Sequence, residues 1–339
     1  MILARKVSIY EVAKYVGVSA AAVSYVINGV DKVGPKTKAK IMQGIEELGY
    51  VPSHNAVALS TGRNNLISLF LPLPEPSEAF LENPFYGEFI GGLEQEIANS
   101  EFDLIISALK DQNRFEFWAR SRGVDGVVII GFLPDVIKNT LKKLSMPTVL
   151  VDIYDEEASA FNNVHINDER GEFEATNYLI QHGHKRIAYL GNIDTSPIDK
   201  KRFSGYERAM REAQLPFNEH LIFTTTTTFD GGYAAGERIA QCPDITAVCC
   251  AADILAIGLM RRYFEMGKNI PRDLSVIGFD DIQAAAYLSP GLTTIRQDIG
   301  EKGHLAAKIL MEALKSDSKA KKNVILEPNL IVRQSVKSI

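Results

Sequence analysis

From Asn65 onward, short apolar runs alternate with helical patterns along the chain. The runs fit buried strands, because they are rich in β-branched residues and are bounded by turn residues. The predicted strands are Leu66–Leu71, Leu104–Ala108, Gly126–Ile130, Thr148–Val151, Ile187–Leu190, Leu221–Thr224, Ala247–Ala251 and Ser275–Phe279. Helical patterns fill the gaps, for example at Tyr86–Ala98, Glu169–Ile180 and Leu255–Tyr263. This alternation predicts an α/β region with two doubly wound parallel sheets, joined by right-handed crossovers and covered on both faces.

An open parallel sheet binds its ligands outside the carboxyl ends of its strands. Two such sheets that face one another form a cleft between them. The sequence therefore predicts a small-molecule site between two lobes of residues 65–339.

The charge of the chain is uneven. Residues 1–64 hold eight lysines and arginines against four acidic residues, a net charge of +4, whereas the other residues hold 29 basic against 38 acidic side chains. With 339 residues, 46% of them hydrophobic, the chain is long enough for two or three domains. The two parts are expected to meet different partners.

The first sixty residues carry signals for short helices. Ser8 and Glu11 have the spacing of a capping box, which predicts a helix at Ile9–Val16. After a glycine-containing turn, Ser19 is a second N-cap candidate, for a helix at Ala20–Ile27.

A third helix is predicted from Pro35 to Gly49, because proline at the first helical position loses no needed hydrogen bond and glycine ends helices. The expected core of the three helices is Val12, Val16, Val23, Ile41, Ile45 and Leu48. Three short helices with a tight turn in a basic segment match the helix-turn-helix arrangement of DNA-binding proteins, although any small helical bundle can show this pattern.

Several signals of other functions are absent or weak. Three cysteines without CxxC spacing indicate free thiols rather than disulfides or zinc ligands. The sequence has no long apolar run of the kind that directs export or membrane insertion, so a cytoplasmic protein is expected. The segment Gly29–Thr37 imitates a phosphate loop but follows no strand, and His182 and His184 lack a third metal ligand. We expect neither catalytic nor metal-binding residues, and no enzyme.

Two N-terminal segments, VSIYEVAKYVGVSAAAVSYVING at Val7–Gly29 and ELGYVPSHNAVALSTGR at Glu47–Arg63, resemble the signature of the LacI/GalR (lactose repressor) family of bacterial transcription regulators. Later segments, among them NPFYGEFIGGLE, HGHKRIAYLGN, DITAVCCAADILAIGLMR and DLSVIGFDD, resemble the effector domain of that family. The resemblance extends over nearly the whole chain.

The resemblance implies a multidomain chain with an all-α helix-turn-helix headpiece and an α/β two-lobed core similar to periplasmic binding proteins. The implied parts are a DNA-binding domain at 6–52, a hinge helix at 53–64 and an effector-binding and dimerisation domain at 65–339. Lobe 1 is expected near 66–164 and 293–322, and lobe 2 near 165–292 and 323–339.

The resemblance also implies the DNA-contacting residues. They are Ser8, Ser19, Ala20, Ala21, Ser24, Tyr25, Asn28, His54, Ala56 and Leu59. Tyr25 stands where an arginine is usual in the family, and the alanines of this helix carry no hydrogen-bonding group, so readout through thymine methyl contacts and DNA shape is expected. Leu59 is expected to wedge into the minor groove, although a plain linker helix is the alternative, and Val57 replaces a usual basic residue.

The residues implied for the effector are Phe85, Tyr86, Arg202, Asp253 and Asp280. A carboxylate, an arginine fork and aromatic faces suit a polyhydroxylated ligand, most simply a sugar. The alternatives are that Asp280 is only a strand-end residue, that Asp253 is only a helix cap, and that Arg202 is a surface cation.

The function implied is that of a homodimeric repressor without a cofactor, which binds a near-palindromic double-stranded DNA operator and responds to a small ligand between its lobes. The alternative is a cytoplasmic ligand-binding protein of the same fold with weak or no specific DNA binding.

Overall fold

The computed structural model describes residues 7–51, 64–72, 83–109, 111–154, 156–217, 219–315 and 320–339, and for 156 and 157 it describes the backbone alone. The chain divides into two compact units, one made of residues 1–66 and 122–125, the other of the remaining residues. The predicted hinge helix, with His54, Ala56 and Leu59, lies outside the described residues.

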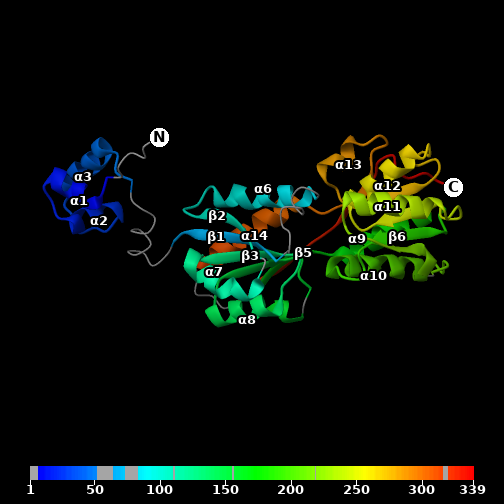
Figure 1. Ribbon diagram of the computed structural model, residues 1–339, viewed down its shortest axis with the longest axis horizontal. Helices are drawn as coiled ribbons and strands as arrows, with labels where there is room; N and C mark the ends of the chain where they lie inside the picture. The colour runs from blue at the N-terminus through cyan, green and yellow to red at the C-terminus, as the bar shows by residue number, and fades with distance from the viewer. Residues whose placement is uncertain are drawn as a thin grey trace. The chain divides into compact units, whose positions relative to one another are not determined.

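The headpiece consists of the helices α1 (Ile9–Val16), α2 (Ala20–Ile27) and α3 (Pro35–Leu48), as the sequence predicts (Figure 1). The capping box forms at α1, where the Ser8 hydroxyl accepts from the Glu11 amide at 3.3 Å and the Glu11 carboxylate accepts from the Ser8 amide at 2.8 Å. These bonds satisfy two amides that the first helical turn leaves without partners.

The core of the headpiece contains Val12, Ala13, Val23, Val26, Ile41 and Tyr50, all buried. The expected Val16, Ile45 and Leu48 are half-buried and pack against it. The helices α1 and α3 approach closely at Gly44, because a Cβ atom added there would lie 2.4 Å from Cγ2 of Val16.

The first sheet of the core has the strand order β11-β5-β4-β3-β1-β2. Its strands are β1 (Leu66–Leu71), β2 (Asp103–Ala108), β3 (Gly126–Ile130), β4 (Thr148–Val151), β5 (Asn162–Ile166) and β11 (Asn323–Leu326). The pairs β1–β3, β3–β4, β4–β5 and β5–β11 are parallel. The hydrophobic runs of the sequence become the central strands, where both faces are buried.

Helices cover both faces of this sheet (Figure 1), and alternate residues of its strands pack against one helical layer or the other. Ile67 and Leu69 belong to one apolar cluster with residues of α6 (Phe85–Ile97) and α14 (Ile299–Lys315). Phe70 belongs to a second cluster, with residues of α7 (Phe115–Arg122) and α8 (Asp135–Leu144). Trp118 packs against this second cluster beside Phe70, with ring centroids 5.3 Å apart.

The second sheet has the order β12-β10-β9-β8-β6-β7, and its pairs are parallel except for β10–β12. Its strands are β6 (Ile187–Gly191), β7 (Ile222–Thr224), β8 (Ala247–Cys250), β9 (Ser275–Asp280), β10 (Thr293–Arg296) and β12 (Asn329–Ile331). The helices of this lobe are α9 (Asp168–Gln181), α10 (Pro197–Glu212), α11 (Phe229–Ala240), α12 (Asp253–Glu265) and α13 (Gln283–Tyr287). Short 3-10 helices lie at η1 (Gln112–Arg114), η2 (Glu156–Ala160) and η3 (Glu219–Leu221).

The chain crosses between the lobes three times, after β5, after β10 and after β11. The lobe boundaries expected near 293 and 323 are wrong, since β10 belongs to the second sheet and β11 to the first. The physical reason is strand pairing: β10 is held in register beside β9 and β11 beside β5, so each crossing takes place after the strand instead of before it.

The structure contains four strands that the apolar runs do not predict: β5, β10, β11 and β12. β5 alternates polar and apolar residues, and β11 and β12 are short, half-exposed strands at sheet edges. The expected free thiols are found, with Cys249 and Cys250 buried and Cys242 half-buried. Among the described helices, none combines the length and apolarity that crossing a membrane requires.

Candidate DNA-binding surface and effector site

The helix α2 exposes two of its expected base-reading residues. Ala21 and Tyr25, one helical turn apart, are both exposed on the surface of the headpiece. The Lys32 ammonium lies 5.2 Å from the centre of the Tyr25 ring, so a cation accompanies the aromatic side chain. This surface offers a methyl group, a phenol and a positive charge, groups that can contact thymine methyls and phosphates; the expected readout through methyl contacts and DNA shape stays a prediction.

The polar residues of α2 also have roles within the headpiece. The Ser19 hydroxyl caps α2 by accepting from the Ala22 amide at 3.1 Å. The Ser24 hydroxyl accepts from the Asn28 side-chain amide at 3.2 Å. These bonds hold the side chains in fixed positions, so a contact with a phosphate would use their remaining hydrogen-bonding capacity.

In the core, Arg202 of α10 is buried among acidic groups and is not the surface cation that the alternative reading allowed. Its Nε donates to Asp168 at 2.7 Å, and its Nη1 donates to Asp280 at 3.3 Å and to the Ala251 carbonyl. The guanidinium carbon lies 3.7 Å from the centre of the Phe279 ring. The expected arginine and carboxylate therefore meet, in a geometry fixed by several partners.

Asp280 ends β9 with a φ of 117°, a conformation that is strained for a residue with a side chain. Its Oδ1 also accepts from the Gln297 side-chain amide at 2.5 Å. Burial raises the pKa of Asp280 to about 6, although Arg202 opposes this shift. Strain and a displaced pKa on one buried carboxylate are typical of functional sites.

Lys302, on α14, has a fully buried ammonium group. Its Nζ donates to both oxygens of Asp152, at 2.9 and 2.8 Å, and to Oε1 of Gln297 at 2.5 Å. Burial raises the pKa of the Asp152 carboxyl, whereas the Lys302 ammonium lowers it. A buried ammonium of this kind is stable only with such partners.

Tyr154 extends the same set of bonds, because its hydroxyl donates to the carboxylate of Asp168. Burial and the charge of Asp168 raise the pKa of the Tyr154 hydroxyl. The residues joined in this way form what we call the interlobe network: Asp152, Lys302, Gln297, Asp280, Arg202, Asp168 and Tyr154. Its members come from the ends of strands in both sheets and from helices of both lobes, so it links the lobes through buried hydrogen bonds.

The aromatic residues expected at the effector lie beside this network. Phe85 and Tyr86 form the first turn of α6, and the Lys302 ammonium is 5.6 Å from the centre of the Phe85 ring. Burial and the nearby Asp152 raise the pKa of Tyr86. The structure thus brings Phe85, Tyr86, Arg202 and Asp280 into one region.

Asp253 has a different position from the one expected. It was expected as an effector residue, with a role as the cap of α12 as the alternative, but the N-cap is Ala252, and Asp253 is the first helical residue. Its two oxygens accept from the Thr294 hydroxyl at 2.6 Å and from the Ile282 amide at 3.0 Å. The cap prediction is wrong because these stronger tertiary partners draw the carboxylate across to β10 and to the segment after β9.

The sequence reasoning missed five members of the network. They are Asp152, Tyr154, Asp168, Gln297 and Lys302. Asp152 directly follows a buried strand, as Asp280 ends one, and that position was a usable signal. Lys302 falls on the face of α14 that is otherwise apolar, with Ile299 and Ala306, and a charge on such a face is a second signal.

Comparison with known proteins agrees with this organisation. Residues 8–53 match the family described as Bacterial regulatory proteins, lacI family, and residues 176–336 match the family described as Periplasmic binding protein-like domain. The first match contains the three helices of the headpiece, and the second contains most of the second lobe and α14.

Three relatives match nearly the whole chain. The HTH-type transcriptional repressor PurR of Vibrio vulnificus (strain CMCP6) is 34% identical over 340 residues, which cover 98% of this chain and 99% of that protein. The ribose operon repressor of Haemophilus influenzae is 31% identical, with 97% and 98% covered. A solved structure, the transcriptional regulator CelR–cellobiose complex, aligns with a TM-score of 0.74 at 27% identity, covering 97% of this chain and 100% of that chain. The chain therefore belongs to the lacI family of bacterial regulatory proteins.

Proposed function

We propose that this protein is a transcription repressor whose affinity for an operator is set by a small polyhydroxylated ligand at the interlobe network. The observation that carries the proposal is the meeting of Arg202 and Asp280, at 3.3 Å, inside a network that joins the two lobes. A group that binds there can act on both lobes at once, which is what linkage between two sites requires.

The bonds of the network define the ligand chemistry. Arg202 and the Gln297 amide donate, whereas Asp280 and Asp152 accept. A hydroxyl group both donates and accepts, so a polyol can take over bonds that these side chains now make with each other. The aromatic faces of Phe85 and Tyr86 supply apolar contacts beside them. Among the relatives, the complex with cellobiose supports a sugar as the first ligand to test.

The operator is the proposed partner of α2. A homodimer presents two such helices related by two-fold symmetry, so the expected operator is near-palindromic, with half-sites about one helical turn apart. A repressor of this kind acts on chromosomal DNA, and the proposal therefore locates it in the cytoplasm. It assigns no catalytic role to any residue.

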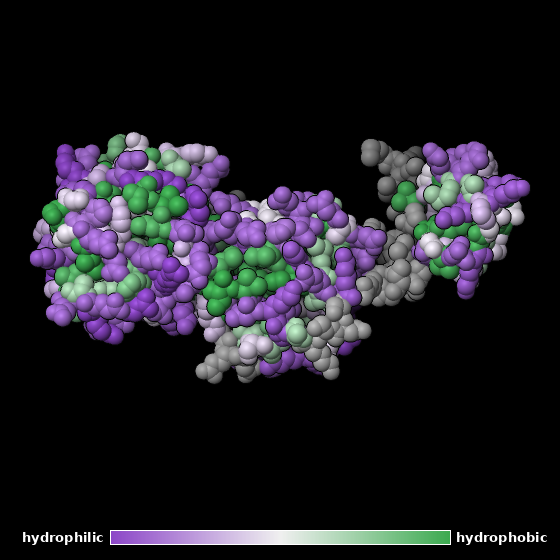
Figure 2. Space-filling view, turned by 180° about the vertical axis from the view of Figure 1, so that it is seen from behind, coloured by the Kyte–Doolittle hydropathy of each residue, from purple (hydrophilic) through white to green (hydrophobic). Residues whose placement is uncertain are grey.

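The surface of the core supports the proposed dimer. Figure 2 shows hydrophobic side chains gathered in patches between hydrophilic ones on both lobes. Phe264 of α12 is 71% exposed and borders a hollow of about 370 Å³ with Ile257, Met260 and Leu288. Exposed apolar surface of this kind is typical of protein interfaces. Phe264→Glu is expected to shift the dimer to monomer in sedimentation velocity, whereas Phe132→Glu, at a similarly exposed phenylalanine of the first lobe, is the matched control.

The DNA-binding part is tested by selecting chromosomal fragments with the full-length protein and measuring affinity by fluorescence anisotropy. The selected fragment should bind more tightly than a scrambled one, and Tyr25→Ala should reduce specific more than non-specific binding. Met42→Ala, at an exposed residue of α3, is the control and should change neither. Equal affinity for selected and scrambled DNA would instead support the alternative of a ligand-binding protein without specific DNA binding.

The ligand part is tested by thermal-shift screening against sugars, sugar phosphates and purines, since a ligand specific to the native state raises apparent stability. The compound found should change operator affinity, and operator DNA should change its affinity by the same factor. Asp280→Asn should abolish the response to the ligand, with circular dichroism to check the fold. A ligand response that survives in Asp280→Asn would contradict the proposed site.

A further inference from the structure

A polar hollow lies at the edge of the first sheet, outside the interlobe network. It has a volume of about 310 Å³ and is bordered by the strands β5 and β11 and by Ile153, Tyr154, Ala158, Ser159 and Phe161. This volume is near the lower end of the range of small-molecule sites, about 300–1,000 Å³. We call it the edge pocket; its polar lining is Tyr154, Ser159, Asn163, His165, Lys321 and Asn323.

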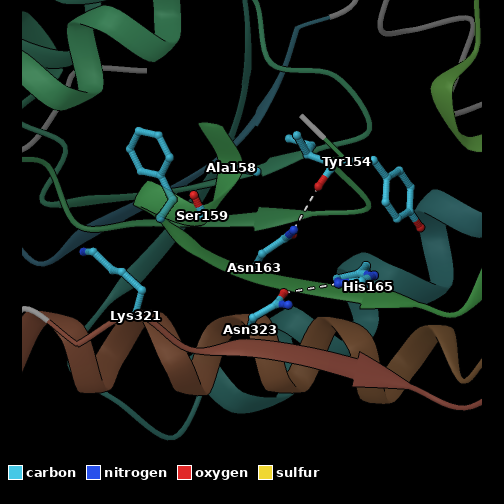
Figure 3. Close-up of a pocket in the computed structure, with 9 residues that line it drawn as sticks. Tyr154, Ala158, Ser159, Asn163, His165, Lys321 and Asn323 are labelled. Carbon is cyan, nitrogen blue, oxygen red and sulfur yellow. Dashed lines mark hydrogen bonds between the residues drawn. The ribbon is translucent and has the colours of Figure 1, made fainter. Parts of the chain in front are cut away.

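The polar side chains of the edge pocket are placed there by the register of the sheet. Asn163 and His165 are two residues apart on β5, so they point to the same face. Asn323 of β11 is the direct neighbour of Asn163 in the parallel pair. Figure 3 shows these three side chains on adjacent strands, with Ser159 and Lys321 on other sides of the hollow.

Asn163 lines this hollow, and in the described part of the chain the oxygen of its side chain lacks a hydrogen-bond partner. The side chain is 93% buried, and its Nδ2 donates to the Ile153 carbonyl at 2.8 Å, but among the described residues no donor reaches its Oδ1. Buried amide oxygens almost always have a hydrogen-bond partner, because leaving one without a partner destabilises the fold. A molecule in the hollow can supply a donor to Oδ1 of Asn163 only if the side chains that cover this oxygen move.

The other walls define what kind of molecule brings that donor. His165 Nε2 and Asn323 Oδ1 lie 3.2 Å apart, and Asn323 also carries an amide nitrogen that can donate. Phe161 and Ile153 add apolar surface to the same hollow. Amide groups next to an aromatic wall suit a small molecule with several hydroxyl groups and apolar C–H faces.

We propose that the edge pocket is a second ligand site of the core, for a small polyhydroxylated molecule whose hydroxyl group donates to Oδ1 of Asn163. This site is separate from the proposed effector site, because its lining shares only Tyr154 with the interlobe network. The edge pocket is formed by residues of the first lobe, so ligand binding there does not depend on the proposed function.

Tyr154 gives the edge pocket a route to the interlobe network. Its ring borders the pocket, while its hydroxyl donates to Asp168, which also binds Arg202. Two of the three crossings between the lobes start from the same strands, β5 and β11. A ligand in the edge pocket therefore changes the hydrogen bonds of the interlobe network as well as the positions of two crossings.

The site is tested by NMR of the full-length protein labelled at the histidine ring carbons, with D-ribose, D-glucose and myo-inositol as probes. His165→Gln identifies the resonance of His165 among the six histidines of the chain. At least one probe should shift this resonance. Ser159→Trp, which fills the pocket from an exposed position, should abolish the shift, and Ala160→Trp on the next exposed residue should retain it.

Two results would overturn the site. One is the absence of a His165 shift with all three probes. The other is an unchanged shift in Ser159→Trp, which would place the bound probe elsewhere, for example at the effector site.

The coupling has its own test, which rests on the proposed function because it uses the operator. In Tyr154→Phe the ring remains but the bond to Asp168 is lost. The probe should still shift His165, yet it should no longer change operator affinity as it does in the wild type. An equal change of operator affinity in both proteins would refute the route through Tyr154.

Discussion

The headpiece and the core use their functional polar groups in opposite ways. On α2, Ala21 and Tyr25 are exposed, and the serines of the helix serve its own cap and an adjacent side chain. In the core, the charged groups of the interlobe network are buried and bonded to one another. The headpiece thus keeps polar and aromatic groups exposed on its surface, whereas the core holds a set of buried bonds that a ligand at the proposed site would have to exchange.

The difference has energetic consequences. Substitutions of exposed residues usually change stability by less than about 0.5 kcal/mol, so the exposed residues of α2 can change with the operator sequence at little cost in stability. Removal of one partner from a buried ionic pair costs roughly 3–5 kcal/mol, because it leaves a buried charge without compensation. Sequence variation in the network is therefore expected to change folding as well as ligand binding.

The largest expected effect comes from Lys302→Met, which keeps the length of the side chain but removes its charge. Asp152 then loses both bonds from the ammonium, and the core should lose roughly 3–5 kcal/mol of stability. Trp118 is the only tryptophan of the chain and packs between rings of the core, so its fluorescence during thermal unfolding measures the loss.

The matched control is Lys308→Met, because Lys308 lies on the same helix but is exposed. It should leave the melting temperature close to that of the wild type. Equal melting temperatures for the two variants would show that Lys302 makes no net contribution to stability. This result would contradict the expected difference between exposed and buried charges.

The next effect concerns Glu172, a buried residue of α9 beside the network. Burial raises its pKa to about 8, although the charge of Arg202 and the nearby thiol of Cys249 oppose the shift. Between pH 4.5, which is the ordinary pKa of this group, and about pH 8, the folded chain holds a proton that the unfolded chain has lost. The free energy of unfolding therefore falls as the pH rises through this interval.

Glu172→Gln removes this titration. The variant should gain stability relative to the wild type as the pH rises, by up to roughly 5 kcal/mol above pH 8, with the smallest difference below pH 4.5. Tryptophan fluorescence during urea unfolding at several pH values measures the difference. Parallel pH profiles of the two proteins would show that Glu172 is not protonated in the fold.

The difference between the headpiece and the core also explains which features could be predicted from the sequence. All three helices of the headpiece follow from local signals, namely the capping box of Ser8, the cap of Ser19 and the proline and glycine at the ends of α3. The central strands follow from apolar runs, because their two faces are buried wherever they pair. These features depend on residues that are close together in the sequence, so they can be predicted from a single sequence.

The interlobe network could be predicted only in part. Arg202 and Asp280 came from the family resemblance, whereas Lys302 and Asp152 are 150 residues apart and meet only after the second crossing has returned the chain to the first lobe. The edge strands β11 and β12 contain apolar runs of only three residues, Val324–Leu326 and Leu330–Val332, since one partner strand and partial exposure suffice for them. Pairings between distant residues of this kind have no local signature.

A smaller effect is expected in the headpiece, where Gly44 allows α1 and α3 to approach. In Gly44→Ala the new Cβ would lie 2.4 Å from the Val16 methyl group, and this clash should outweigh the better helix propensity of alanine, for a net loss of about 1–2 kcal/mol. Hydrogen exchange of α1 and α3 in the full-length protein measures the local stability. Lys40→Ala, at an exposed residue of α3, is the control, and faster exchange in it than in Gly44→Ala would contradict the packing argument.

The smallest expected effect on stability comes from Ser19→Asp, which separates the structural role of the N-cap from its expected DNA contact. Aspartate caps helices as well as serine does, and its charge is favourable at the start of a helix, so hydrogen exchange of α2 should remain unchanged.

Non-specific DNA affinity should fall in this variant, because a negative charge now faces the phosphates, and the slope of log affinity against log salt should decrease by about one phosphate contact. Thr228→Asp makes the same exchange at the cap of α11 in the core and should leave DNA binding intact. If Ser19→Asp binds DNA like the wild type, with the same salt slope, then the start of α2 does not face the phosphate backbone, and the exposed surface around Tyr25 must meet DNA in a different orientation.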